Sequence, residues 1–130
     1  GMLCIELFVT KDQHVLVNEL APRPHNSGHY TIEGCVTSQY ENHIRAILGL
    51  PLGSTELIRP TVMKNIIGNV NKKAEVHGLE EAYKYPEVKI HIYGKEECRV
   101  GRKMGHITVT DKTIEDALFK ARFAHSKFKF

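Results

Sequence analysis

Two glutamates near the start of this 130-residue chain, Glu6 and Glu19, are the side chains best suited to chemistry. Each lies in an apolar run, and the polar residues between the two runs predict the turn of a β-hairpin. A turn centred between Asp12 and Gln13 pairs the two glutamates across the ladder, where like charges destabilise a sheet unless a cation lies between them. Paired carboxylates suit Mg²⁺ that also binds the phosphates of a nucleotide.

The alternative is a pair of exposed surface carboxylates, which are common in proteins and need no metal. Strict alternation along the strands predicts two sets of residues that share a face: Cys4, Glu6 and Phe8 on the first strand, and Val15, Val17 and Glu19 on the second. A carboxylate among apolar neighbours is costly without a partner, so this pattern adds some support to the metal site.

Two further segments are rich in groups that bind anions. Residues 23–29 offer a guanidinium, two imidazoles, an amide, a hydroxyl and a glycine, which suit a phosphate or a ribose but also a solvated turn. Residues 95–106 carry four cations around glycines, and composition alone favours a charged turn over a second phosphate clamp. The histidines lack a ligand set at zinc spacing, so zinc is not expected.

The remaining pattern predicts an α+β fold. A soft boundary in residues 50–60 separates an amino-terminal part, 1–58, from a small β-rich subdomain with a carboxy-terminal helix, 59–130. The expected elements are a loop over 21–34, a helix capped by Ser38 and Glu41 and ended by Gly49, strands over 61–67, 88–93 and 106–110, and helices over 78–85 and 113–127.

Helical spacing also predicts which residues of the two longer helices are apolar on one face. The first helix has Tyr40, Ile44, Ile47 and Leu48 at this spacing, and the last helix has Ile114, Ala117, Leu118 and Ala121 directed inward.

Composition excludes several classes of protein. The net charge of +3 is small and no aromatic residues are interleaved with the basic ones, so nucleic acid is not an expected partner. No apolar stretch is long enough to span a bilayer, so a membrane is not expected either. The three cysteines form no Cys-x-x-Cys pair, which favours reduced thiols in a cytoplasmic protein.

Several segments together resemble 5-(carboxyamino)imidazole ribonucleotide synthase, the ATP-dependent carboxylating member of the ATP-grasp superfamily. The most specific is residues 17–30, VNELAPRPHNSGHY. The others are residues 35–41 (CVTSQYE), 50–55 (LPLGST), 93–96 (YGKE) and 101–106 (GRKMGH), so the resemblance covers most of the chain.

The resemblance implies a function and a set of site residues. The reaction is the carboxylation of aminoimidazole ribonucleotide with ATP and bicarbonate, through carboxyphosphate, in de novo purine biosynthesis. The implied roles are Mg²⁺ binding by Glu6 and Glu19, nucleotide binding by Asn18 and Glu19, catalysis by Arg23, substrate binding by His25, Asn26 and Ser27, and binding of the ribonucleotide phosphate by Lys95 and Arg102.

The same resemblance implies a longer enzyme, commonly a homodimer. Residues 1–58 would be the end of the ATP-grasp domain and residues 59–130 the carboxy-terminal subdomain, with a missing amino-terminal part as partner. We therefore expect the isolated chain to be inactive. The alternative is a non-catalytic ligand-binding or interaction module that retains the fold.

Overall fold

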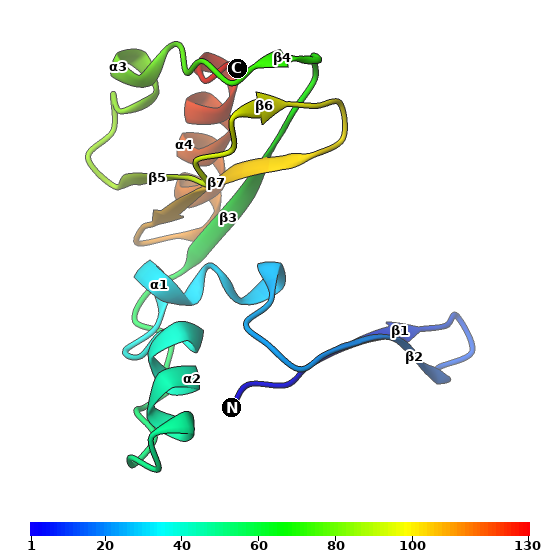
Figure 1. Cartoon of the computed structure of the whole chain (residues 1–130). Coiled ribbons are helices and arrows are strands. Elements are labelled where there is room, and N and C mark those ends of the chain that lie inside the picture. The colour runs from blue at the N-terminus through cyan, green and yellow to red at the C-terminus, as the bar shows by residue number, and fades with distance from the viewer. The chain divides into compact units, whose positions relative to one another are not determined.

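The chain is described over all residues, 1–130, in a computed structural model, which divides it into unit 1, Gly1–Ile58, and unit 2, Arg59–Phe130 (Figure 1). Helices and strands are mixed in both units, and the predicted α+β class is confirmed. No helix is both long enough and apolar enough to span a membrane.

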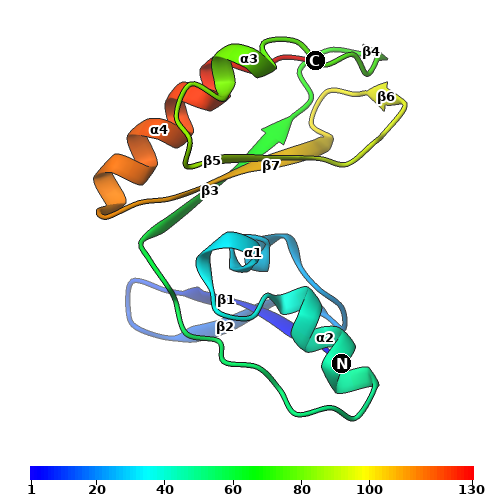
Figure 2. The same ribbon diagram turned by 90° about the vertical axis from the view of Figure 1, so that its left-hand side faces the viewer.

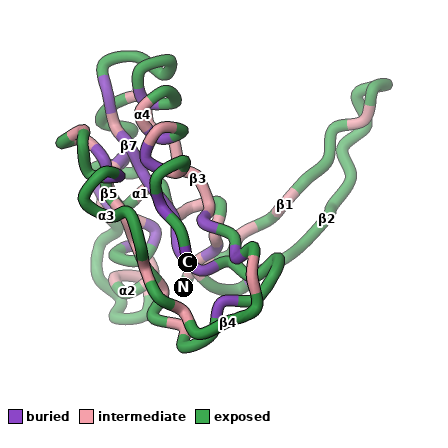
Figure 3. Tube along the Cα trace, turned by 90° about the horizontal axis from the view of Figure 1, so that it is seen from above, coloured by how far each residue is buried: buried purple, intermediate pink, exposed green.

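The predicted hairpin is formed by β1 (Cys4–Val9) and β2 (Val15–Ala21), which are antiparallel. Its turn is centred on Asp12, half a residue from the predicted centre between Asp12 and Gln13. Gln13 adopts a positive φ of 65° in this turn. Apolar side chains are exposed on both faces, and most of the hairpin is coloured as exposed in Figure 3.

A β-bulge at Asn18 interrupts the register of the hairpin. Leu7 pairs with Val17, and the next residue, Glu6, pairs with Glu19, so Asn18 is the extra residue of β2. The predicted pairing of Glu6 with Glu19 is confirmed. The predicted face of β2 is wrong, because the bulge breaks the alternation and places Val17 on the face opposite the two glutamates.

Two short helical segments lie in the stretch that the sequence predicts as a loop. These are η1 (Asn26–Gly28) and α1 (Thr31–Gly34), and the chain then enters α2 (Gln39–Ile47). The predicted cap of α2 is half formed: Ser38 Oγ accepts from the Glu41 N–H at 3.1 Å. The Glu41 carboxylate instead accepts from Arg45, one turn along the helix.

The buried face of α2 is polar, which the apolar spacing does not predict. Gln39 and Asn42 are buried, whereas all four apolar residues at helical spacing are exposed: Tyr40, Ile44, Ile47 and Leu48. The two buried amides are satisfied because each pairs with the backbone of another segment. Gly49 ends the helix with a φ of 68°, as predicted.

Unit 2 is built on an antiparallel sheet in the order β3 (Thr61–Ile67), β7 (Lys103–Thr110) and β5 (Val88–Ile92). Helix α4 (Ile114–Lys127) contacts β3 and β7, and α3 (Leu79–Ala82) contacts α4 (Figure 2). A two-residue ladder of β4 (Lys72–Lys73) and β6 (Glu97–Cys98) is not predicted from the sequence.

The face that α4 buries differs from the predicted one. Ala117, Ala121 and Ala124 are fully buried, whereas Leu118 and Ile114 are 37% and 47% exposed. Small side chains let the helix backbone approach the strands closely, so the alanines form the contact. Two of the four residues predicted to point inward are therefore misplaced.

Candidate metal centre

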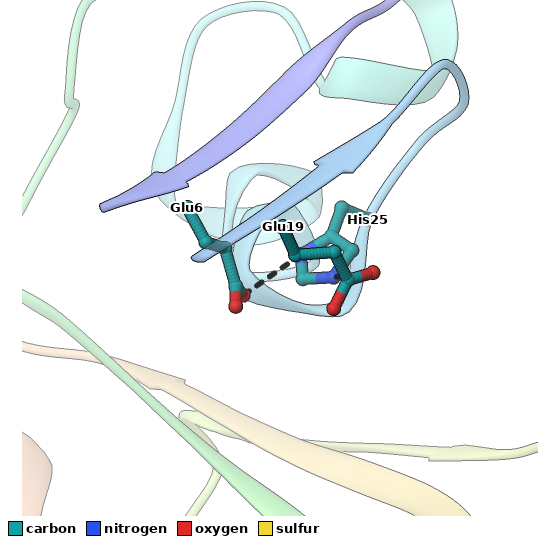
Figure 4. Close-up of side chains that lie close together, drawn as sticks. All are labelled: Glu6, Glu19 and His25. Atoms are coloured by element: carbon teal, nitrogen blue, oxygen red, sulfur yellow. Dashed lines mark ion pairs between the residues drawn. The ribbon is translucent and has the colours of Figure 1, made fainter. Parts of the chain in front are cut away.

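The carboxylates of Glu6 and Glu19 and the imidazole of His25 converge in unit 1. One ligand atom from each residue lies within 4.8 Å of the other two. Figure 4 shows the three side chains directed toward one another from the two strands and the loop that follows them. The two carboxylates lie close enough together to reach one ion, which is the geometry that the predicted metal site requires.

The bulge brings the two carboxylates to one face of the hairpin. Beyond the pairing itself, Asn18 Nδ2 donates a hydrogen bond to Glu6 Oε2 at 3.1 Å. Both residues that the resemblance assigns to the nucleotide site therefore contact Glu6: Asn18 donates a hydrogen bond to it, and Glu19 is its cross-strand partner. Two carboxylates this close repel each other, which makes a cation at this place favourable.

His25 completes the cluster and is the only one of its three residues that is buried. Its Nδ1 lies 3.5 Å from Glu6 Oε1, and its Nε2 lies 3.8 Å from Glu19 Oε1. The ring also caps η1, where Nδ1 accepts from the Ser27 N–H at 3.3 Å. The sequence resemblance implies a substrate-binding role for His25, and no spacing along the chain reveals its approach to the two glutamates.

Of the other predicted residues of the loop, Ser27 contacts the cluster, and Arg23 and Asn26 lie close to His25 along the chain. Ser27 Oγ lies 2.9 Å from His25 Nδ1, and Asn26 begins η1. The exposed guanidinium of Arg23 donates to the carbonyl of Pro24 at 3.0 Å. His25 and Ser27 also line a cavity of about 300 Å³ within unit 1.

Lys95 and Arg102 lie in unit 2, in and beside the polar loop that precedes β7. Lys95 Nζ donates to the carbonyl of Lys103, and Arg102 Nη1 donates to the carbonyl of Glu97 at 3.1 Å. Burial, and then the charge of Arg102, lower the pKa of Lys95. Two cations that repel each other in this way attract an anion, which is the property that the predicted phosphate site requires.

The donor set of the cluster fits a divalent cation. Glu6 and Glu19 supply the hard oxygen ligands that Mg²⁺ prefers. The Asn18 amide leaves Glu6 Oε1 available because it donates to Oε2. His25 adds a nitrogen donor that Mg²⁺ does not need, so its place in the cluster calls for a role beside the metal.

Comparison with known proteins gives the class of protein. Residues 1–40, which contain the candidate metal centre, match the ATP-grasp domain family. Residues 61–120 match the family described as the phosphoribosylaminoimidazole carboxylase C-terminal domain. The chain thus contains parts of both families, and its resemblance to the N5-carboxyaminoimidazole ribonucleotide synthases is confirmed.

Curated and solved relatives agree with this assignment. The chain is 56% identical over 108 residues to the N5-carboxyaminoimidazole ribonucleotide synthase of Bacillus subtilis, covering 83% of this chain and 27% of that protein. The crystal structure of the Thermotoga maritima synthetase is 56% identical, with a TM-score of 0.87, over 98% of this chain and 36% of that one. This chain thus spans about a quarter to a third of the length of these relatives.

Several solved relatives carry ligands in their descriptions. One of them is the Aspergillus clavatus synthase in complex with ADP and 5-aminoimidazole ribonucleotide, 40% identical with a TM-score of 0.81, over 95% of this chain and 34% of that one.

Proposed function

We propose that this chain provides the metal-binding edge and the carboxy-terminal subdomain of an enzyme that carboxylates 5-aminoimidazole ribonucleotide with ATP and bicarbonate. The convergence of Glu6, Glu19 and His25 is the observation that carries the proposal. The ligands in the description of the Aspergillus clavatus relative support ATP and aminoimidazole ribonucleotide as substrates. The step belongs to de novo purine biosynthesis.

In the proposed reaction, bicarbonate attacks the γ-phosphorus of ATP and ADP leaves, which gives carboxyphosphate. The exocyclic amine of the ribonucleotide then attacks the carboxyl carbon, and phosphate leaves. Phosphoryl transfer depends mainly on alignment and on neutralising charge. Mg²⁺, when bound by Glu6 and Glu19, supplies part of that neutralisation at the ATP phosphates.

The residues of this chain have separate tasks in the proposal. Asn18 orients the Glu6 carboxylate and lines the nucleotide site beside Glu19. Arg23, whose guanidinium is exposed, stabilises the negative charge of the transferring group. His25, Asn26 and Ser27 bind the ribonucleotide near the metal, and Lys95 and Arg102 bind its phosphate.

The domain assignment and the partners are also proposals. We assign residues 1–58 to the ATP-grasp domain and residues 59–130 to the carboxy-terminal subdomain, with the family matches at 1–40 and 61–120 as support. The relatives are longer, so further polypeptide would supply the rest of the site. We also propose a homodimer, which the family resemblance implies, and a cytoplasmic location, which the free thiols of the three cysteines support.

Calorimetry of the 130-residue chain with MgATP tests whether the rest of the enzyme is needed for ATP binding. We expect no binding in the low-micromolar range, because the walls that hold adenine belong to other parts of an ATP-grasp enzyme. Tight binding by the chain alone would contradict this expectation.

Complementation tests the function itself. The chain is mixed with the amino-terminal part of the Bacillus subtilis relative, and release of phosphate that requires both bicarbonate and the ribonucleotide is measured. The wild-type chain should restore this release and the Glu19→Gln chain should not. Failure of the folded wild-type chain would favour a non-catalytic module.

A further inference from the structure

The side-chain amide of Gln39, the first residue of α2, pairs with both backbone groups of His25. Its Oε1 accepts from the His25 N–H at 3.0 Å, and its Nε2 donates to the His25 carbonyl at 2.8 Å. Gln39 is 8% exposed, so these bonds are shielded from water. A buried pair of this kind imitates one rung of a β-ladder and holds both polar groups of the His25 backbone.

The same residue holds the segment that follows His25. Gln39 Nε2 lies 2.9 Å from His29 Nδ1, and the Gln39 N–H donates to Thr31 Oγ1 at 2.9 Å. The Thr31 hydroxyl in turn donates to the Gly28 carbonyl at 2.6 Å. The loop on both sides of η1 is therefore tied to one side chain.

Gly28 is required by this arrangement. A Cβ at Gly28 would lie 2.5 Å from Gln39 Oε1 and 2.7 Å from Gln39 Cδ, which is closer than atoms pack. The loop thus passes directly over the amide, and a side chain at position 28 would have to displace it.

A second buried amide on the same helix gives a natural comparison. Asn42 accepts from the Gly53 N–H at 2.8 Å and donates to the Gly53 carbonyl at 3.3 Å. It therefore clamps another loop in the same way, three residues along the same buried face of α2. Neither Asn42 nor Gly53 belongs to the metal cluster.

We propose that Gln39 is a positioning residue of the candidate metal centre. It fixes the His25 backbone so that the imidazole reaches both Glu6 and Glu19. The His25 carbonyl also accepts from the Gly28 N–H within the loop, at 2.9 Å, but Pro22 and Pro24 carry no N–H and cannot donate backbone hydrogen bonds beside His25. The proposal rests on the proposed function only in taking this cluster to be the metal centre.

The test compares Gln39→Leu with Asn42→Leu in the 130-residue chain, by NMR. Both variants lose one buried amide clamp, so both should lower the stability of unit 1. Only Gln39→Leu should raise the exchange rate of the His25 amide, by about tenfold, because only that amide loses its acceptor. Unit 2 resonances, unchanged in both variants, show that the rest of the chain is folded.

Two spectroscopic readouts report the ring itself. In the wild type, Mn²⁺ should broaden the His25 ring resonances, and the ring should show NOE contacts to the Glu6 side chain. Gln39→Leu should lose both signals, and Asn42→Leu should keep both. Wild-type signals in Gln39→Leu, or the same loss in both variants, would overturn the positioning role.

Gln39→Glu decides the case in which Gln39→Leu leaves unit 1 unfolded. The carboxylate keeps an acceptor for the His25 N–H but places an oxygen against the His25 carbonyl. We expect a protected His25 amide with weakened NOE contacts from the ring, and unchanged contacts would refute the proposal. Absence of Mn²⁺ broadening in the wild type would count against the proposed metal site alone, since amide exchange and NOE contacts do not depend on the metal.

Discussion

Glu6 and Glu19 face each other across the hairpin because Asn18 occupies an extra position in β2. Between the turn and the bulge, Leu7 pairs with Val17. If that register continued, Glu6 would face Asn18, and Glu19 would face Ile5 on the other side of the sheet. One inserted residue therefore creates the carboxylate pair, and it also supplies the amide that orients Glu6.

Replacing one of the paired carboxylates should have opposite effects on stability and on metal binding. In metal-free buffer, Glu19→Gln removes repulsion from Glu6 and should raise the free energy of unfolding of unit 1 by about 0.2–1 kcal/mol. The same change should weaken Mn²⁺ binding at least about tenfold, since it removes one charged ligand. Urea titration and Mn²⁺ titration measure the two effects, and Glu75→Gln at an exposed site is the control. Lower metal-free stability would argue against repulsion between the glutamates.

A methyl group at Gly28 should displace Gln39 from its hydrogen bonds. We expect Gly28→Ala to lower the free energy of unfolding of unit 1 by about 1–3 kcal/mol, the cost of leaving buried polar groups unsatisfied. A Gln39→Ala background removes the three atoms nearest to the added methyl, so the same change should cost much less there. Urea denaturation of the two single variants and the double variant gives the coupling, and additive effects would contradict the contact.

The buried face of α4 can be tested by enlarging a buried side chain in one variant and shortening a half-exposed one in another. Ala121→Leu overfills a fully buried site and should destabilise unit 2 by about 1–3 kcal/mol or more. Leu118→Ala removes a side chain that is 37% exposed and should cost about 1 kcal/mol or less. Thermal denaturation of the two variants measures the loss of stability in each. A larger loss for Leu118→Ala than for Ala121→Leu would support the buried face predicted from the sequence.

Unit 2 should lose stability in acid through the ion pairs of Lys120. Its Nζ lies 2.7 Å from Asp111 Oδ2 and 2.8 Å from Glu87 Oε1. Hydrogen bonds from Lys120, and then from a backbone N–H, lower the pKa of both carboxyls below their ordinary values of 3.8 and 4.5. A lowered folded-state pKa contributes stability above the unfolded value, and this is lost as the pH falls through the folded pKa.

Asp111→Asn checks this pH dependence. Urea midpoints of the wild type should exceed those of the variant at pH 7, and the gap should close as the pH falls below the ordinary pKa of 3.8. Glu115→Gln changes an exposed residue of α4, the helix that carries Lys120, and its urea midpoint should stay close to that of the wild type at every pH. A gap for Asp111→Asn that does not change with pH would show that lost packing, and not charge, explains its effect.

Local sequence signals predicted the secondary structure of unit 2 well. Residues 61–67 form a strand with the predicted bounds, and Thr113 caps α4 by accepting from the Asp116 N–H. The buried faces were harder to predict. Spacing identifies apolar residues but not their partners, so it missed the amides that α2 buries and the alanines that α4 buries.

The sequence predicted the hairpin, the pairing of Glu6 with Glu19 and the family that the following loop resembles, because these signals lie in residues close together in the chain. The pairing holds although the observed turn centre lies half a residue from the predicted one, since the bulge at Asn18 makes up the difference. Only the tertiary structure decided that His25 joins the two carboxylates and that Gln39 holds it there. Those contacts join residues from different elements, 14 positions apart in the case of His25 and Gln39. Their geometry depends on a bulge and on a helix that meets the loop, and no local pattern of residue types encodes either of them.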